Sequence, residues 1–204
     1  MMNERRSLIA LAFSAVFATS AFANATVDAP APTFSATTAD GRTVDLASLR
    51  GKTVVLEWTN HDCPYVRKHY ESGNIPAQQK DAAAKGIVWL QVISSAAGQQ
   101  GYVDGATATA LNSKRGAAPA NILLDPSGQI GKAYGAQTTP HMYVITPDGK
   151  LAYKGGIDSI ATADKSDIAK ADPYVKLALA DLAAGRKVAQ ASTRPYGCSI
   201  KYAN

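Results

Sequence analysis

The chain has 204 residues, of which 46% are hydrophobic, and a formal net charge of +5. This length provides one domain with room for a proper hydrophobic core. Lysines and arginines are scattered along the sequence and form no basic stripe with interleaved aromatic residues, which argues against nucleic-acid binding. We interpret the mild positive charge as a contribution to solubility, with some attraction for acidic partners.

The N-terminus has the pattern of a secretory signal peptide. Two arginines precede a short apolar stretch, and small residues in overlapping A-x-A patterns follow it. This pattern predicts a Sec-type signal peptide over residues 1–25, cleaved after Ala23 or Ala25, and export to the periplasm or another extracytoplasmic compartment. An uncleaved membrane anchor is the less favoured alternative because the apolar stretch is short.

The rest of the chain predicts one α/β domain over residues 33–187, between a linker at 26–32 and a C-terminal tail at 188–204 that carries Cys198. Aromatic residues in the tail suggest that it docks on the domain. Strands alternating with helices favour a central mixed β-sheet flanked by helices, with an N-terminal hairpin extension. The predicted elements are a hairpin over 34–44, a helical turn over 45–49, strands over 53–58, 87–93 and 121–124, helices after Cys63 and over 76–84, 106–114, 130–134 and 173–184, and a hairpin over 142–154.

The junction after the strand over 53–58 is the most informative segment. Asn60-His61-Asp62 breaks the strand, and Cys63 and Pro64 follow. Proline is tolerated in the first turn of a helix, so Cys63 is expected at a helix N-terminus. Unpaired N–H groups and the helix dipole favour the thiolate there. The pattern therefore predicts a reachable nucleophilic or redox-active thiol, with a buried inert cysteine as the less favoured alternative.

Cys198 is the second of the two cysteines in the chain. An even pair in an oxidising compartment favours a disulfide between Cys63 and Cys198. In the chain-entropy model a loop of this size contributes about 5 kcal/mol of stability. The sequence leaves open whether such a bond is a permanent staple or a cycling disulfide.

The order of elements, with Cys63 after the first long strand and Thr139-Pro140 before the last hairpin, resembles the thioredoxin fold. Over residues 30–185 it is similar to the redoxin branch, which groups thioredoxin-like oxidoreductases with alkyl hydroperoxide reductase and thiol-specific antioxidant proteins. The resemblance implies that Cys63 is the attacking cysteine, that Pro140 is cis beside it, and that the Thr139 backbone pairs with an extended substrate segment. Glu57 matches a buried acidic residue that assists proton transfer; a solvated or ion-paired edge residue is the alternative.

Two departures from the redoxin patterns bear on the chemistry. The fourth position of a thioredoxin-type C-x-x-C motif is Val66, so an internal dithiol is impossible there. In the peroxiredoxin pattern P-x-x-x-[ST]-x-x-C, the proline position is occupied by Leu56 and the serine or threonine position by Asn60. The nearest threonine, Thr59, stands one position too early. These substitutions argue against specialised peroxidase chemistry, although Asn60 remains a hydrogen-bond donor for a substrate.

The favoured hypothesis is an exported thiol–disulfide oxidoreductase in which Cys198, on a mobile tail, resolves the intermediate formed at Cys63. A peroxiredoxin-like thiol peroxidase is the second hypothesis, and a non-catalytic, disulfide-stapled binding module is the third. The expected partners are protein disulfides or peroxide as substrate, together with a thiol reductant. The residues expected at the site are Cys63, Cys198 and Glu57 for catalysis and Thr139, Pro140, Pro64 and Asn60 for substrate binding.

No cofactor, metal ion or stable membrane insertion is expected. A metal site formed by His61, Cys63 and His141 is the least favoured hypothesis, because their spacing matches no local ligand motif. His69 is expected on the surface of its helix. The sequence leaves the oligomeric state and the direction of the redox reaction open.

Overall fold

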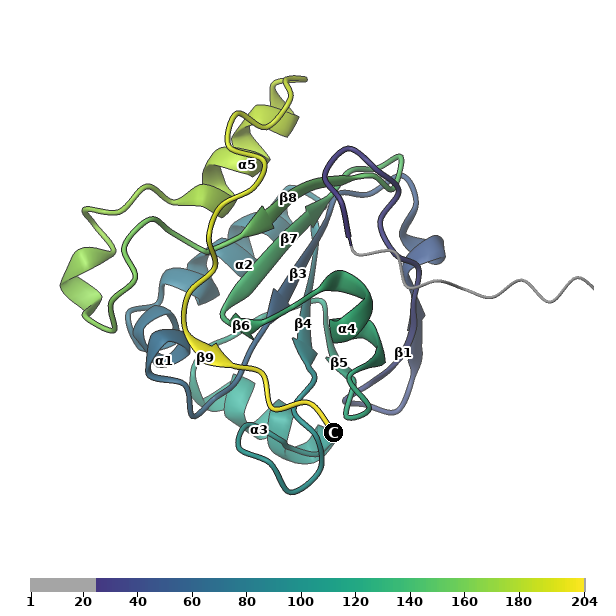
Figure 1. Cartoon of the computed structure of the whole chain (residues 1–204), viewed down its shortest axis with the longest axis vertical. Helices are drawn as coiled ribbons and strands as arrows, with labels where there is room; N and C mark the ends of the chain where they lie inside the picture. Colours follow the sequence, from purple (N-terminus) through teal and green to yellow (C-terminus); the bar gives the residue numbers. More distant parts are fainter. Residues whose placement is uncertain (1–24, 204) are drawn as a thin grey trace, which may run out of the picture.

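The computed structural model describes residues 25–203, so the predicted signal peptide lies outside the described residues except for Ala25. The chain forms a mixed sheet in the strand order β2-β1-β5-β4-β3-β7-β8, and β6 pairs with β9 in a separate small sheet (Figure 1). The strands are β1 (Ser35–Thr38), β2 (Thr43–Asp45), β3 (Val54–Trp58), β4 (Val88–Ile93), β5 (Asn121–Leu124), β6 (Thr138–Thr139), β7 (His141–Ile145), β8 (Leu151–Gly155) and β9 (Cys198–Ser199).

The centre of the sheet is parallel, whereas its two margins are antiparallel. β4 runs parallel to β3 and β5, while β7 and β8 on one side and β1 and β2 on the other run antiparallel to their neighbours. A strand covered on both faces is expected to be apolar along its length. Every residue of β3 is buried, and so is every residue of β4 after the first. The predicted central mixed sheet with an N-terminal hairpin extension is confirmed.

The helices match the predicted elements apart from their ends. α2 begins before the predicted start at Pro76, because Gly73, with φ of +76°, turns the chain directly after α1. None of the helices within residues 25–203 is both long and apolar enough to span a bilayer. The helices are α1 (Pro64–Glu71), α2 (Asn74–Ala84), α3 (Gly105–Lys114), α4 (Gln129–Tyr134) and α5 (Tyr174–Ala183), with 3₁₀ turns η1 (Leu46–Leu49) and η2 (Lys165–Asp167).

Two apolar clusters occupy opposite faces of the sheet, because successive side chains along a strand alternate between its faces. Val55 of β3 belongs to a cluster that includes residues of α1, α2 and α5, and this cluster also contains Cys63. Trp58 belongs to the opposite cluster, where Tyr134 of α4 and Tyr143 of β7 pack against its ring. The face covered by α1, α2 and α5 is therefore the one that holds the cysteine.

Residues 26–32, expected as a linker, pack against the sheet. The N–H of Asp28 donates to the Leu151 carbonyl oxygen at 2.8 Å, and the N–H of Ala31 donates to that of Gly149 at 3.0 Å. Ala31 is buried. This segment therefore extends the last hairpin at its edge, an arrangement that its alanine–proline composition does not reveal.

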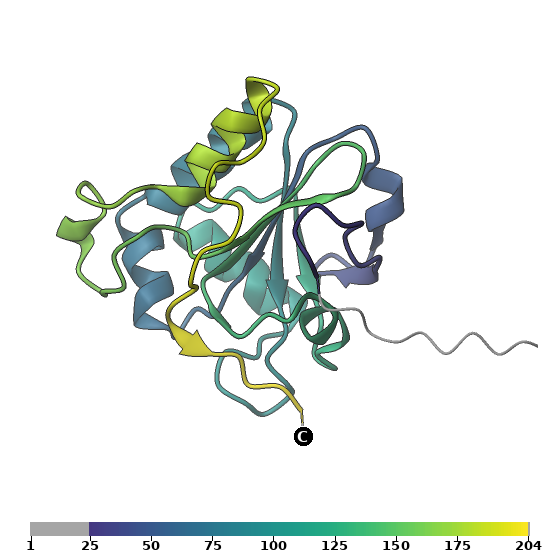
Figure 2. The ribbon, with the colours of Figure 1, turned by 45° about the horizontal axis from the view of Figure 1, so that its top comes forward.

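The tail after α5 is hydrogen-bonded to the domain at several places along its length. The Lys154 N–H donates to the Ala191 carbonyl oxygen at 3.0 Å, and the Thr193 N–H donates to that of Lys154 at 3.1 Å. Further along, β9 pairs with β6, and the Tyr202 hydroxyl donates to the Ala136 carbonyl oxygen at 2.8 Å. Figures 1 and 2 show the tail running from α5 past β8 to β9. The prediction that tail aromatics dock on the domain is confirmed at Tyr202.

Candidate active site

Cys63 lies where the chain passes from β3 to α1. It occupies the N-cap position of α1 in an extended conformation, with φ of −72° and ψ of 122°, and Pro64 is in the first turn. The N–H of Cys63 donates to the Asn60 carbonyl oxygen at 3.1 Å, which closes the loop after the strand. The position predicted for Cys63, at a helix N-terminus directly before a proline, is therefore observed.

A short loop with a cis peptide bond between Thr139 and Pro140 packs against this cysteine. The Cys63 thiol donates to the Thr139 carbonyl oxygen, with 3.1 Å between the sulfur and the oxygen. Thr139 belongs to β6 and is buried. The cis form implied by the resemblance is present, and the sulfur and the backbone of β6 belong to one site.

The C-terminal tail brings the second cysteine to this site. β9 pairs antiparallel with β6, and this pairing sets Cys198 opposite Thr139. The backbone N–H of Cys198 donates to Cys63 Sγ at 3.4 Å. Both cysteines are free thiols in the structure. Two cysteines that lie 135 positions apart in the sequence thus meet through a strand pair.

Gly197 makes the close approach of the tail possible. Its φ is +125°, and a Cβ added there would lie 2.0 Å from the Thr139 carbonyl oxygen and 3.4 Å from the Pro140 nitrogen. Only glycine adopts such a backbone conformation without strain and leaves room for the neighbouring carbonyl group. The glycine directly before Cys198 is therefore a requirement for pairing between β9 and β6.

The docked tail covers the Cys63 sulfur. Cys63 is 0% exposed, whereas Cys198 is half-buried. The expectation of a reachable thiol is therefore wrong for the docked arrangement, because Cys198 and the strand that carries it lie over the sulfur. In this arrangement the sulfur is not accessible to a partner molecule.

The surroundings of Cys198 keep its thiol protonated. Burial, a hydrogen bond with Cys63 and the charge of Cys63 raise the pKa of Cys198 well above its ordinary value, although Lys201 acts in the opposite direction. At neutral pH the Cys198 sulfur is therefore a thiol and not a thiolate.

Glu57 is buried in β3 on the same face of the sheet as Cys63. It is 0% exposed and accepts hydrogen bonds from the Tyr70 hydroxyl at 2.5 Å, Trp89 Nε1 at 2.7 Å and Gln79 Nε2 at 3.2 Å. Burial raises the pKa of Glu57, although these hydrogen bonds lower it. The alternative of a solvated or ion-paired edge residue is therefore wrong. Among the hydrogen bonds of residues 25–203, none joins Glu57 to Cys63 directly.

Asn60 supports the loop behind the cysteine. Its Oδ1 accepts a hydrogen bond from the Asp62 N–H at 2.9 Å, and a Cβ added to Gly101 would lie 2.5 Å from its side chain. Asn60 is buried, and its Nδ2 has no hydrogen-bond partner within the described part of the chain. A contact between Asn60 and a substrate stays a prediction.

The three residues of the metal-site hypothesis do not converge. The ring of His141 packs on Tyr143, with 4.6 Å between their centroids, and Tyr143 belongs to the cluster on the opposite face from Cys63. His61 lies 3.3 Å from the carboxyl group of Asp62. In the described ranges, no group of three or more His, Cys, Asp and Glu side chains is arranged to hold a metal ion.

His69 is fully buried, so the expectation of a surface position is wrong. Its Nδ1 accepts a hydrogen bond from Asn74 at 2.8 Å, and its Nε2 lies 3.1 Å from the Tyr196 hydroxyl oxygen. Burial lowers the pKa of His69 to about 4, so the imidazole is neutral at neutral pH. The sequence gives no signal for this, because Lys68-His69 reads as an ordinary polar pair and its partners lie in distant segments.

The sequence matches the model of the AhpC/TSA family over residues 27–154, which is more than half of the chain. The chain belongs to the AhpC/TSA family. The matched range contains Glu57, Cys63 and the loop with cis Pro140, and it ends before Cys198. No curated protein matches this AhpC/TSA protein.

Solved structures place this family member in the thioredoxin fold. An uncharacterized conserved protein from Geobacillus kaustophilus is 24% identical, with a TM-score of 0.73 over 90% of this chain and 94% of that one. A hypothetical protein from Sinorhizobium meliloti 1021 is 22% identical, with a TM-score of 0.72 over 89% and 97%. A putative thiol:disulfide interchange protein DsbE from Chlorobium tepidum is 22% identical, with a TM-score of 0.51 over 63% and 85%. At these identities the likeness establishes the fold alone.

Replacing Gly197 with alanine should lift the tail from Cys63, because the new Cβ collides with the Thr139 carbonyl oxygen. Backbone strain of this kind changes an equilibrium by about tenfold or more. We therefore expect iodoacetamide to alkylate Cys63 at least about tenfold faster in a Cys198→Ser background, as measured by mass spectrometry. Gly185→Ala is the matched control, because Gly185 has φ of +69° but open space around it. Equal rates for the two variants would contradict the role of Gly197.

Proposed function

We propose that this AhpC/TSA protein is an exported thiol–disulfide oxidoreductase in which Cys63 and Cys198 form and break an intramolecular disulfide. The observation that carries the proposal is the pairing of β9 with β6, which brings the Cys198 N–H to 3.4 Å from Cys63 Sγ. Family membership supports an oxidoreductase activity in general. The raised pKa of the half-buried Cys198 thiol supports Cys198 as the sulfur that reacts second, and the place of Cys63 at the N-terminus of α1 supports Cys63 as the attacking sulfur.

The reaction proceeds in two exchanges of sulfur bonds. The Cys63 thiolate attacks one sulfur of a partner disulfide, a mixed disulfide forms, and the other partner sulfur leaves as a thiolate that takes up a proton. Cys198 then loses its proton and attacks the Cys63 sulfur. The Cys63–Cys198 disulfide forms, and the remaining partner sulfur leaves as a thiol. The partner disulfide is reduced, the two protein thiols are oxidised, and the same steps run in reverse for the opposite direction.

The tail and the partner compete for the same place. When β9 leaves β6, the Thr139 backbone is free to pair with an extended partner segment, as the resemblance to redoxins implies. Pro64 directly follows Cys63 and Pro140 directly follows Thr139, so both are proposed to line the approach of a partner, and Asn60 Nδ2, which is buried and has no hydrogen-bond partner among the described residues, is proposed as a donor. A partner segment bound along β6 therefore takes the place of β9.

Export and the electron partner are part of the proposal. The signal-peptide pattern over residues 1–25 supports a periplasmic or otherwise exported protein with a domain over 33–187 and a tail over 188–204. In an oxidising compartment a reductase of this kind needs a thiol reductant to restore Cys63 and Cys198. Its substrates are protein disulfides.

Replacing Cys198 with serine should trap the first intermediate, because nothing resolves the mixed disulfide. With oxidised glutathione we expect a stable glutathione adduct on Cys63 in the variant and a Cys63–Cys198 disulfide in the parent protein, both read by mass spectrometry. Cys63→Ser is the control and should form no glutathione adduct on Cys198, because burial still raises the pKa of that thiol. A parent disulfide that resists glutathione, with a potential below about −300 mV, would instead support a disulfide-stapled binding module.

Thiol peroxidase activity is the second candidate, favoured by membership of the AhpC/TSA family. In that reaction the Cys63 thiolate attacks one peroxide oxygen and becomes a sulfenic acid, and water leaves after protonation. Cys198 then forms the disulfide and releases a second water. Because Leu56 and Asn60 replace the peroxiredoxin residues, we expect stopped-flow oxidation of the reduced protein by hydrogen peroxide to be no faster than that of free cysteine. Faster oxidation would favour the peroxidase.

Glu57 is proposed to accept the proton that Cys198 releases as it attacks. The raised pKa of Glu57 then gives the resolution rate an acid limb, because the rate falls as Glu57 takes up a proton on lowering the pH. Glu57→Gln should slow resolution at pH 7 by about tenfold or more and abolish this limb. Trp89→Phe removes one donor to the carboxylate but keeps the acceptor, so it should move the limb to higher pH. An unchanged limb in Glu57→Gln would refute the role.

A further inference from the structure

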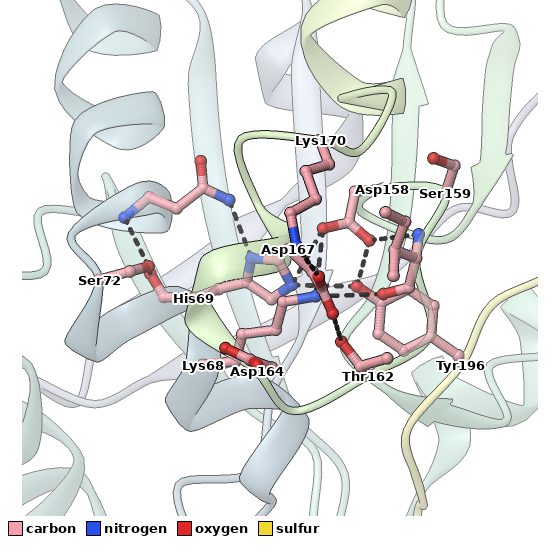
Figure 3. A network of polar contacts seen from close by, with 12 residues as sticks. Lys68, His69, Ser72, Asp158, Ser159, Thr162, Asp164, Asp167, Lys170 and Tyr196 are labelled. Atoms are coloured by element: carbon pink, nitrogen blue, oxygen red, sulfur yellow. Dashed lines mark hydrogen bonds and ion pairs between the residues drawn. The ribbon is translucent and has the colours of Figure 1, made fainter.

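Figure 3 shows a polar network in which Lys68, His69, Asp158 and Tyr196 lie together. Lys68 and His69 come from α1, Asp158 follows β8, and Tyr196 comes from the tail. The side chains of Lys68 and His69 are 0% exposed, and that of Asp158 is 4% exposed. A buried charge is unfavourable unless other groups pair with it. The contacts among these four side chains therefore decide whether the segments stay together.

The Tyr196 hydroxyl stands at the centre of the network. It donates to Asp158 Oδ1 at 2.5 Å, and its oxygen lies 3.1 Å from His69 Nε2. Because Asn74 Nδ2 donates to His69 Nδ1, the proton of the neutral imidazole is on Nε2, which donates to the Tyr196 oxygen. The hydroxyl thus accepts a hydrogen bond from His69 and donates one to Asp158. Both hydrogen bonds are lost if the tail leaves.

Lys68 supplies the charge that accompanies Asp158 in the interior. Its Nζ donates to the Ile160 carbonyl oxygen at 3.1 Å and lies 3.6 Å from Asp158 Oδ2. The Lys68 Nζ also lies 5.7 Å from the centroid of the Tyr196 ring, a cation–π distance. The ring of Tyr65 packs edge-on against Tyr196, with 5.8 Å between the centroids. Tyr196 is therefore held both by its ring and by its hydroxyl group.

The network is directly linked to both cysteines through the chain. Tyr196 lies two residues before Cys198, with Gly197 between them, and Lys68 and His69 lie on the helix that begins after Cys63. If Tyr196 leaves the network, the tail loses its fixed point on α1 just before the strand that covers Cys63. The pairing of β9 with β6 spans only two residues of each strand, and the next contacts that hold the tail lie at Thr193 on one side and at Ile200 and Tyr202 on the other.

We propose that Lys68, His69 and Asp158 form a latch for Tyr196 that sets how often the Cys198 tail uncovers Cys63. These three residues and Tyr196 are positioning residues, since they act on the sulfur through the tail and do not touch it. The latch rests on the proposed function, in which a partner disulfide reacts with Cys63 only after the tail has moved. Its strength therefore sets the rate at which reduced protein engages a partner.

Tyr196→Phe tests the latch because it keeps the ring and removes only the hydroxyl. In a reduced Cys198→Ser background we expect iodoacetamide to alkylate Cys63 about tenfold faster, the effect of losing a hydrogen bond to a charged group. Mixed-disulfide formation with oxidised glutathione should accelerate by the same factor, because both reagents reach Cys63 only when the tail is away from it. Equal rates with and without the hydroxyl would overturn the latch.

Tyr134→Phe is the matched control. The Tyr134 hydroxyl donates to the Pro32 carbonyl oxygen at 2.8 Å, and Tyr134 lies in the cluster on the opposite face from Cys63. It also loses one buried tyrosine hydroxyl and its hydrogen bond, so a general loss of stability would accelerate both variants and overturn the latch. An acceleration confined to Tyr196→Phe supports it. If the parent protein forms no Cys63–Cys198 disulfide, the proposed function fails, whereas the alkylation rates still decide the latch.

Discussion

The pairing of β9 with β6 is the contact on which the site depends. β6 has two residues, and without β9 its backbone would present unpaired N–H and C=O groups at an edge. The tail satisfies these groups and brings Cys198 to Cys63 in the same step. The backbone edge of β6 is thus occupied by the protein itself. In the proposed function a partner segment takes the place of β9 along this edge, so protection of the Cys63 sulfur and its reaction with a partner exclude one another.

Two buried polar networks lie on the face of the sheet that holds Cys63, and they differ in which segments of the chain they join. The carboxyl group of Glu57 receives donors from α1, α2 and β4, all within the domain. The network around Asp158 includes Tyr196 from the tail. Movement of the tail leaves the hydrogen bonds of Glu57 in place, whereas it removes Tyr196 from the network around Asp158. This difference is the reason for assigning proton exchange to Glu57 and control of access to Asp158 and its partners.

The extent of the family match separates two parts of the chain. Residues 27–154 supply the sheet, the N-terminus of α1 with Cys63 and the loop with cis Pro140. The segment after residue 154 supplies Asp158, Tyr196 and Cys198, which contact that scaffold from outside the matched range. The matched range therefore supplies Cys63, and the tail supplies its cover and its proposed resolving partner.

The sequence by itself determined the elements and the place of Cys63, because both follow from short-range patterns. Apolar runs, turn residues and a Cys-Pro step at a strand end each act over a few residues, and the structure confirms them. It did not determine the burial of Cys63 and His69, the packing of residues 26–32 or the pairing of Thr139 with Cys198. Those depend on contacts between segments far apart in the chain, such as His69 with Tyr196 across 127 positions. Only the folded chain brings such groups together, since no local pattern records which distant backbone will cover a given side chain.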